Sequence, residues 1–239
     1  MLELLIVALA SLLAGFVDAV VGGGGLVLVP ALFGVFPNAA PATLFGTNKG
    51  ASIWGTAWAT GQFVRRVDLD WRALLPAALV ALLGSFAGAW TVTLVSAGGL
   101  RKALPLILLA VLIYTLAKKD LGRSHAPRFR GGRETAVAAC IGLVIGFYDG
   151  FFGPGTGSFF VFLFVRLLGY DFLHASATAK LMNTATNAAA LVLFAAKGHV
   201  WWHLAAVMAV TNVLGSLVGT RMALSRGAGF VRGMFVLVV

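Results

Sequence analysis

The sequence predicts an all-α polytopic membrane protein built from two homologous halves, and three observations carry that prediction. Of its 239 residues, 60% are hydrophobic and 11% are charged, whereas soluble proteins carry about 25% charged residues. A run of glycines interrupts a long apolar stretch at residues 15–30, G-F-V-D-A-V-V-G-G-G-G-L-V-L-V-P. A similar stretch recurs at residues 146–157, G-F-Y-D-G-F-F-G-P-G-T-G, displaced by 131 residues.

The displacement of 131 residues holds without a gap to the end of the chain. A constant displacement over about 100 residues indicates an internal duplication. Each duplicated unit is too long for a solenoid repeat and has the size of half a transporter. The predicted division is residues 1–117 for the first membrane repeat, 118–133 for a linker and 134–239 for the second repeat. The matched pairs include Gly15/Gly146, Asp18/Asp149, Lys49/Lys180, Trp71/Trp202, Gly84/Gly215, Gly88/Gly219 and Arg101/Arg232.

Each half is predicted to contain four segments, of which the first is broken by glycines. Four glycines cost a helix roughly 1 kcal/mol each relative to alanine, so the first segment should stop and restart at the run. Glu3 stands where a secretory signal would carry Lys or Arg, so we interpret the N-terminal segment as structure. The expected segments are residues 2–21 with 26–36, 43–60, 73–95 and 104–117, then 135–152 with 159–168, 176–196, 204–224 and a shorter last one from Phe230.

The glycines of the third long segment in each half have another expected role. Gly84 and Gly88 have a small-xxx-small spacing that lets a neighbouring helix approach closely, as do Gly215 and Gly219. We interpret these four as packing residues. Their spacing predicts tight helix contacts and no binding site.

The linker at residues 118–133 carries six basic residues against one acid, which predicts a cytoplasmic location. If both broken segments cross the membrane completely, the two halves are parallel and many loop arginines lie outside. If each broken segment dips in and returns to its own side, the halves are inverted, the N- and C-termini lie outside, and most loop arginines face the cytoplasm. The positive-inside rule favours the inverted arrangement, and the parallel one stays open.

The net charge, the single cysteine and the absence of enzyme motifs exclude several classes of function. The net charge of +10 comes from basic residues in short loops, so we expect a lipid bilayer and no nucleic acid as partner. The lone Cys140 has no disulfide partner, and neither zinc-ligand spacing, nucleotide motif nor His-containing triad is present. We therefore predict no metal, no cofactor and no enzyme. A homodimer is left open.

Two matched polar sets point to an anion. Lys49, Ser52 and Thr56 share one helix face, and Lys180, Asn183 and Asn187 repeat those positions. A lysine at the bilayer centre costs at least about 2.5 kcal/mol, so such residues usually pair or line a pathway. Each glycine break also opens a short helix whose first N–H groups carry partial positive charge and can bind an anion.

The predicted site therefore combines both breaks with both lysines. Asp18 and Asp149 are candidates for proton coupling or charge pairing, and the lysines could instead be their structural counter-ions. The predicted substrate-binding residues are Gly22, Gly23, Gly24, Gly25, Lys49, Ser52, Gly153, Gly155, Thr156, Gly157, Lys180 and Asn183.

The doubled G-F-x-D-x-x-x-G-x-G motif, each copy followed by Thr-x-Lys, resembles the sulfite exporter TauE/SafE family over nearly the whole chain. The resemblance implies a secondary transporter in a bacterial or archaeal plasma membrane that exports sulfite or a related sulfur-containing anion, and it falls on Gly22, Gly24, Lys49, Gly153, Gly155 and Lys180. Pro154 and Thr156 depart from the family's richer glycine runs and make the half-sites unequal. The alternatives are import of thiosulfate or another organic anion, or an intramembrane enzyme or assembly factor.

Overall fold

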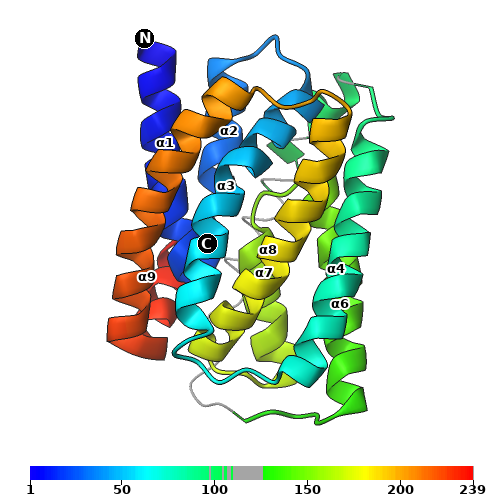
Figure 1. Ribbon diagram of the computed structural model, residues 1–239, viewed down its shortest axis with the longest axis vertical. Helices are drawn as coiled ribbons and strands as arrows, with labels where there is room; N and C mark the ends of the chain where they lie inside the picture. The colour runs from blue at the N-terminus through cyan, green and yellow to red at the C-terminus, as the bar shows by residue number, and fades with distance from the viewer. Residues whose placement is uncertain (97, 104, 107–108, 110–125, 239) are drawn as a thin grey trace.

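The computed structural model describes residues 1–96, 98–103, 105–106, 109 and 126–238, and this part of the chain is helical with no strand (Figure 1). The last helix, α9, runs through a kink at Gly227, whose φ of 70° and ψ of −166° are not helical. The elements are α1 (Leu2–Val21), α2 (Gly25–Val35), α3 (Pro41–Phe63), α4 (Trp71–Val92), α6 (Gly132–Phe151), α7 (Thr156–Leu163), a π-helical turn (Phe164–Leu168), α8 (Phe172–Ala196) and α9 (Trp202–Val238).

The predicted segments agree closely with these helices. The break at residues 22–24 separates α1 from α2, and residues 152–155 separate α6 from α7. The two segments predicted at 204–224 and from Phe230 lie on either side of the non-helical Gly227, where two helical parts of α9 meet. Most of the segment predicted at 104–117, and residues 118–125 of the linker, lie outside the described residues.

Within the described residues, four helices are long and apolar enough to cross a membrane, namely α1, α4, α6 and α9. Their outward faces expose large apolar side chains such as Leu9 on α1 and Leu83 on α4, as expected of a surface covered by lipid. The helices α3 and α8 have 23 and 25 residues, long enough to span, but bury polar residues on their inner faces. The chain is therefore an integral membrane protein with a polar interior.

Helices α1, α3 and α9 run in the same direction (Figure 1). Along α1 and α9, Ser11 Oγ donates to the carbonyl of Met208, and further on a Cβ at Gly219 would lie 2.5 Å from the carbonyl oxygen of Phe16. Along α3 and α9, the start of α3 lies against His199, and Ser216 Oγ donates to Gly55 further down. The three helices form one parallel group.

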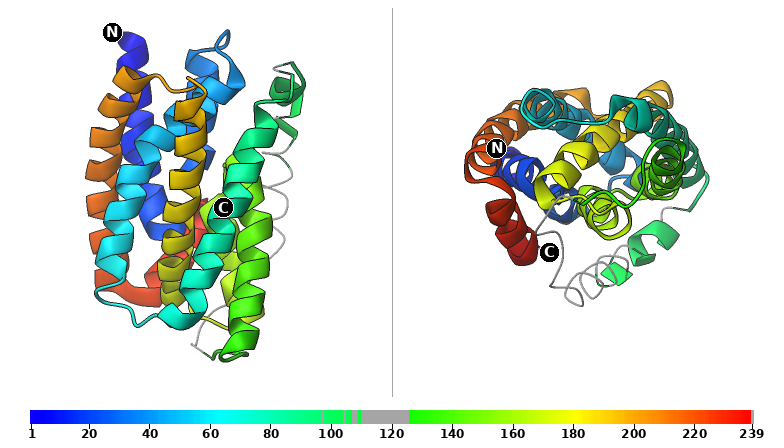
Figure 2. Two further views of the ribbon diagram at one scale, coloured as in Figure 1. Left: turned by 45° about the vertical axis from the view of Figure 1, so that its right-hand side comes forward. Right: turned by 90° about the horizontal axis from the view of Figure 1, so that it is seen from below.

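Helices α4, α6 and α8 form a second parallel group that runs the opposite way. A Cβ at Gly84 would lie 2.6 Å from the carbonyl oxygen of Leu143 on α6, and one at Gly88 would lie 2.0 Å from that of Phe147. The contacts between α3 and α8 show that the two groups are antiparallel. Near its end, α3 contacts α8 through Thr60 and Thr184, whereas near its beginning, at Gly46, it lies against Phe194, which is further along α8. The two views of Figure 2 show the same packing from the side and from below.

The contacts between these helices repeat with the 131-residue displacement. Gly84 lies against the carbonyl of Leu143, and Gly215 lies against that of Leu12. Ser85 Oγ donates to the carbonyl of Thr186, as Ser216 Oγ does to that of Gly55. The four glycines predicted to pack helices do so, because each meets a neighbouring backbone where a side chain would not fit.

Each broken segment turns back to the end of the molecule where it begins. Phe36, just after α2, stacks edge-on against Trp201 at 5.2 Å, next to the start of α9 and on the side where α1 starts. At the opposite end, Tyr170 follows the π-helical turn and donates to Glu134 in the first turn of α6. The α1–α2 and α6–α7 hairpins therefore enter from opposite ends.

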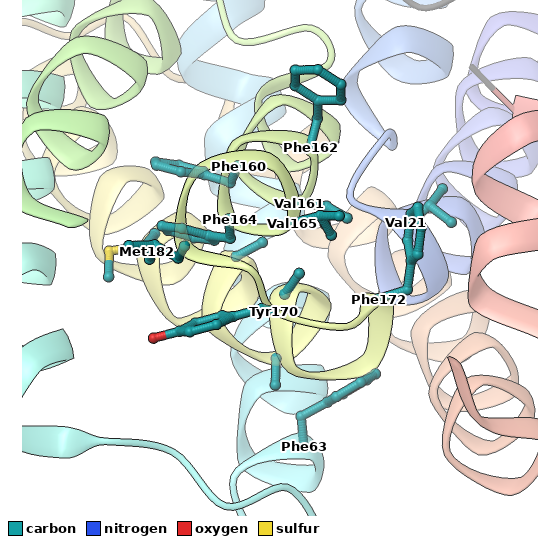
Figure 3. Close-up of a cluster of buried hydrophobic side chains, with 14 of the residues drawn as sticks. Val21, Phe63, Phe160, Val161, Phe162, Phe164, Val165, Tyr170, Phe172 and Met182 are labelled. Atoms are coloured by element: carbon teal, nitrogen blue, oxygen red, sulfur yellow. The ribbon is translucent and has the colours of Figure 1, made fainter. Parts of the chain in front are cut away.

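An aromatic cluster packs α7 and the π-helical turn after it against α8 (Figure 3). Phe160 and Phe164 stack at 5.7 Å between ring centres, and both are fully buried with Phe63 of α3 and Met182 of α8. Inside a membrane, where lipid is as apolar as these side chains, such a cluster stabilises the fold through close van der Waals packing. The cluster holds the second half of α7 against α8, while the start of α7 meets the break that follows α1 through the Ser158 N–H and the Gly22 carbonyl.

Candidate functional site

The two glycine breaks touch each other near the centre of the bundle. A Cβ at Gly22 would lie 2.5 Å from the backbone of Gly157, and one at Gly157 would lie 2.3 Å from the carbonyl oxygen of Gly22. The Ser158 N–H donates to that same carbonyl at 3.1 Å. Only glycine allows this approach, and Gly22 also has a φ of 78°, which disfavours any other residue.

The first break places a carboxylate beside the start of α2. Gly22 closes α1 by donating its N–H to the carbonyl of Asp18 at 2.9 Å. The Asp18 carboxylate then accepts hydrogen bonds from Thr56 Oγ1 of α3 at 3.0 Å and from the backbone of Gly24. A carboxylate of the chain itself thus occupies the N-terminus of α2, where anions are stabilised.

The second break is built differently, as its sequence indicated. Gly153 and Gly155 have φ values of 94° and 80°. The Thr156 hydroxyl donates to the carbonyl of Gly153 at 2.7 Å, and Tyr148 donates to that of Pro154 at 2.6 Å. The two residues that depart from a plain glycine run, Pro154 and Thr156, therefore belong to a turn held by two side-chain hydroxyls, whereas the turn of the first break is closed by the backbone, with the Leu26 N–H donating to the Gly23 carbonyl at 3.0 Å.

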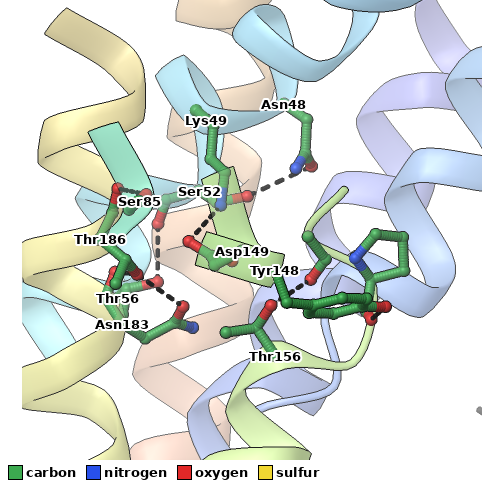
Figure 4. A network of polar contacts seen from close by, with 12 residues as sticks. Asn48, Lys49, Ser52, Thr56, Ser85, Tyr148, Asp149, Thr156, Asn183 and Thr186 are labelled. Carbon is green, nitrogen blue, oxygen red and sulfur yellow. Dashed lines mark hydrogen bonds and ion pairs between the residues drawn. The ribbon is translucent and has the colours of Figure 1, made fainter. Parts of the chain in front are cut away.

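The two buried lysines associate with the break of the opposite half. Lys49 Nζ on α3 lies 2.5 Å from Asp149 Oδ2 on α6, and the two residues are 3% and 2% exposed (Figure 4). Lys180 Nζ on α8 donates to the carbonyl of Asp18 at 3.2 Å and lies 4.7 Å from the ring centre of Phe63. The sequence offered both aspartates as partners and suggested Asp18, in the same half, as the structural counter-ion of Lys49. That pairing is wrong, because Lys49 pairs with Asp149 of the other half, and Lys180 bonds to the backbone carbonyl of Asp18.

Most of the predicted site residues surround one small central cavity of about 20 Å³. That volume is close to the minimum for a single water molecule. Gly23, Gly155 and Lys180 are the predicted residues that do not line it. The lining residues are Ala14, Asp18, Gly22, Gly24, Gly25, Asn48, Lys49, Ser52, Asp149, Gly153, Thr156, Gly157, Asn183, Asn187 and Asn212.

Three lining residues, Ala14, Asn48 and Asn212, were not singled out in the sequence, and a fourth, Asn187, was noted only as part of a polar helix face. Asn212 on α9 donates from Nδ2 to the carbonyl of Ser11 on α1 at 3.1 Å. Its match in the first half is Ala81, so the repeat carried no signal for it. The available signal was the polarity of Ser11 and Asn212 inside apolar segments, which is uncommon unless such groups are paired.

The short helices also offer fewer donors than the sequence suggested. We expected the first N–H groups of α7 to be unpaired, but the Ser158 N–H is already bound to Gly22. At α2, the Gly24 backbone is bound to Asp18. The lysines and side-chain amides therefore provide more of the site's donors than its helix N-termini do.

A larger cavity of about 280 Å³ lies at the end where α4, α6 and α8 begin, among Asp68, Asp70, Glu134 and Tyr170. Three carboxylates make it unfavourable for an anion despite the neighbouring Arg130. Burial, followed by the hydrogen bond to Glu134, raises the pKa of the Tyr170 hydroxyl above its ordinary value, so Tyr170 stays a neutral donor. Within the described residues, no cluster of His, Cys, Asp or Glu could hold a metal ion.

A helical membrane protein whose charged residues are buried where two broken helices meet has the architecture of a membrane transporter. The chain belongs to the sulfite exporter TauE/SafE family, whose family model matches residues 7–239. This confirms the resemblance noted in the sequence.

Curated relatives cover nearly the whole chain. The "Probable membrane transporter protein YfcA" of Escherichia coli is 40% identical over 230 residues, covering 95% of this chain and 83% of that protein. The "Probable membrane transporter protein ORF9" of a Sinorhizobium species is 36% identical over 231 residues, covering 96% and 86%. A "Probable membrane transporter protein" of Haemophilus influenzae is 34% identical over 228 residues, covering 94% and 86%. No solved structure matches the chain.

Proposed function

We propose that this protein is a secondary transporter that exports sulfite or a related small sulfur-containing anion across the plasma membrane. The observation that carries the proposal is the buried Lys49–Asp149 ion pair, which lies between α3 and the second glycine break. A buried charge pair at the meeting point of two broken helices is typical of a transport site. The family's description as sulfite exporters supports this substrate class.

In the proposed mechanism the anion replaces Asp149 as the partner of Lys49. The central cavity of about 20 Å³ has room for about one water molecule, so an anion fits only after the ion pair and the breaks separate. The amides of Asn48 and Asn183, which line the cavity, can donate to its oxygens, and Ser52 can do so once its hydroxyl leaves Asn48 Oδ1, to which it donates at 3.4 Å. The observed arrangement is then an occluded one, and opening to either side alternates around it.

We further propose that the two halves form an inverted repeat, with the basic end of the molecule in the cytoplasm. The repeated Gly84/Leu143 and Gly215/Leu12 contacts support this, as do the opposite directions of α1 and α6. The arginines gathered at one end favour its cytoplasmic placement. They are Arg65, Arg66, Arg72, Arg128, Arg130, Arg133, Arg166, Arg221 and Arg226, whereas Arg101, Lys102 and Lys197 lie at the other end.

Two alternatives remain as outcomes of one experiment. The protein could import thiosulfate or another organic anion, or it could be an intramembrane enzyme or assembly factor. Purified protein is reconstituted into liposomes, and flux of sulfite, thiosulfate and an organosulfonate is measured in both directions. We expect sulfite flux that Lys49→Met abolishes. Flux of thiosulfate alone would favour the importer, and chemical turnover without flux would favour the enzyme.

A further inference from the structure

A groove of about 190 Å³ lies between α3 and α9, close to the basic end of the molecule and away from the central cavity. Its walls combine two arginines with an amide, a hydroxyl and apolar side chains. The lining residues are Trp58, Gln62, Arg66, Leu217, Thr220, Arg221 and Leu224. None of them belongs to the proposed transport site.

The positive charge of this groove is not neutralised by the described part of the chain. Arg66 from the end of α3 and Arg221 from α9 are both exposed, and no acidic side chain lies within ion-pair distance of either among the described residues. Thr220 between them is 2% exposed, and its hydroxyl oxygen has no hydrogen-bond partner. Two arginines facing one groove repel each other unless an anion lies between them.

The groove opens sideways, toward the surface that lipid covers. Trp58 on its rim is 43% exposed, and Leu214 and Val218 on the adjoining face of α9 are also exposed. Tryptophan beside arginine is typical of the boundary between the lipid headgroups and the acyl chains. A ligand in the groove would therefore meet both water and hydrocarbon.

The matched place at the other end of the molecule is closed by the protein itself. By the 131-residue displacement, Arg66 corresponds to Lys197 and Arg221 to Trp90. Lys197 Nζ donates to Thr93 Oγ1 at 2.7 Å and lies 4.0 Å from the ring centre of Trp90. The matched place thus carries a single cation with internal partners, whereas the groove carries two cations and no such partners among the described residues.

We propose that the groove between α3 and α9 binds the phosphate headgroup of an anionic phospholipid. Arginine forks match phosphate oxygens by bidentate hydrogen bonds, and Gln62 and Thr220 provide further donors. The apolar side chains of Trp58, Leu217 and Leu224 suit the first carbons of the acyl chains. A basic groove between membrane helices at the end with most arginines suits an anionic lipid better than a free anion.

The test measures lipid retention by native mass spectrometry of the whole purified protein, titrated with phosphatidylglycerol or with phosphatidylcholine. We expect phosphatidylglycerol to bind about tenfold more tightly than phosphatidylcholine. The variant Arg66→Gln/Arg221→Gln should lose that preference. The control Arg65→Gln/Arg226→Gln removes the same charge from the same end, outside the groove, and should keep it.

Two further measurements test the groove. The first concerns the Thr220 hydroxyl, and the second distinguishes a bound lipid from a bound free anion. Thr220→Val should weaken phosphatidylglycerol binding by a few fold, since it removes only the unpaired hydroxyl. Inorganic phosphate or sulfite at millimolar concentration should not displace the lipid. Each of three outcomes would overturn the proposal. They are equal loss of phosphatidylglycerol binding in both double variants, no preference for phosphatidylglycerol in the unmodified protein, and displacement of the lipid by a free anion. If the double variant does not purify, Arg66→Gln and Arg221→Gln are measured singly against Arg65→Gln.

Discussion

Lys49 and Asp149 form a 2.5 Å ion pair across the two halves of the molecule, although they lie 100 residues apart in the chain. Lys180 has the corresponding position in the other half and bonds to the carbonyl of Asp18. Each lysine therefore reaches the glycine break of the half to which it does not belong. The charges that are proposed to bind the anion also join the two halves.

The first prediction concerns this ion pair. Lys49→Met leaves the Asp149 carboxylate buried without its partner, and we expect a loss of stability of about 3–5 kcal/mol. Lys49→Met/Asp149→Asn should recover most of that stability, because no uncompensated charge remains. It should not recover transport, because the cation for the anion is still missing. Thermal unfolding in detergent and anion flux in liposomes measure the two effects.

A matched control distinguishes pairing from general loss of charge. Lys49→Met/Asp18→Asn removes the same number of charges of each sign but leaves Asp149 buried without a partner. Stability should therefore stay low, because Asp18 contacts Thr56 and Lys180 and not Lys49. Recovery of both stability and flux in Lys49→Met/Asp149→Asn would make Lys49 a structural counter-ion only. Lys49→Arg should not restore full flux, since a broad guanidinium does not replace a compact ammonium in a buried site.

The second prediction concerns the contact between the two breaks. Gly22→Ala places a Cβ 2.5 Å from the Gly157 backbone and imposes a side chain on a φ of 78°, which alone costs about 1–2 kcal/mol. Gly157→Ala meets the Gly22 carbonyl at 2.3 Å. We expect both variants to lose transport and to unfold at lower temperature.

Gly34→Ala is the control for these variants. Gly34 lies within α2, and a Cβ there would meet no atom within 4 Å, so stability and flux should be unchanged or slightly increased. Transport that persists in Gly22→Ala and Gly157→Ala would show that the close approach of the breaks is dispensable. Gly24→Val tests the same region, since its Cβ would lie 2.6 Å from the carbonyl oxygen of Ala14.

Much of the fold could be predicted from the sequence, because apolar run lengths and glycine breaks are local signals. The segment predicted at residues 2–21 forms α1 with the same bounds. The crossing of Lys49 to Asp149 could not be predicted, since a repeat shows which residues correspond and not which ones touch. The role of Asn212 in the cavity could not be predicted from the repeat either, because its counterpart, Ala81, has no polar group.

The third prediction concerns orientation. Leu2 is exposed at the end where α1 begins, and Gly132 has open space at the opposite end, so cysteines at these positions should be accessible without strain. After Cys140→Ala, we expect Leu2→Cys to react with an impermeant thiol reagent from outside the cell. Gly132→Cys should react only in inverted vesicles. The reverse labelling pattern would contradict a cytoplasmic basic end.

The last prediction concerns proton coupling at Asp149. An anion that takes Lys49 as its partner leaves the Asp149 carboxylate buried beside a second negative charge, which strongly favours protonation. The other charged groups at the site do not relieve this, because Lys180 bonds to the Asp18 carbonyl and the Asp18 carboxylate accepts from Thr56.

The anion and a proton should therefore move in the same direction. With an organosulfonate inside the liposomes, an acidic interior should accelerate its efflux relative to an alkaline interior. Asp149→Asn is neutral at every pH, so any flux that remains in this variant should not depend on the gradient. Protein-free liposomes report the leak of the organosulfonate through the lipid, which is subtracted. Flux in the unmodified protein that is indifferent to the imposed gradient would exclude proton coupling and leave a uniporter driven by the anion's own electrochemical gradient.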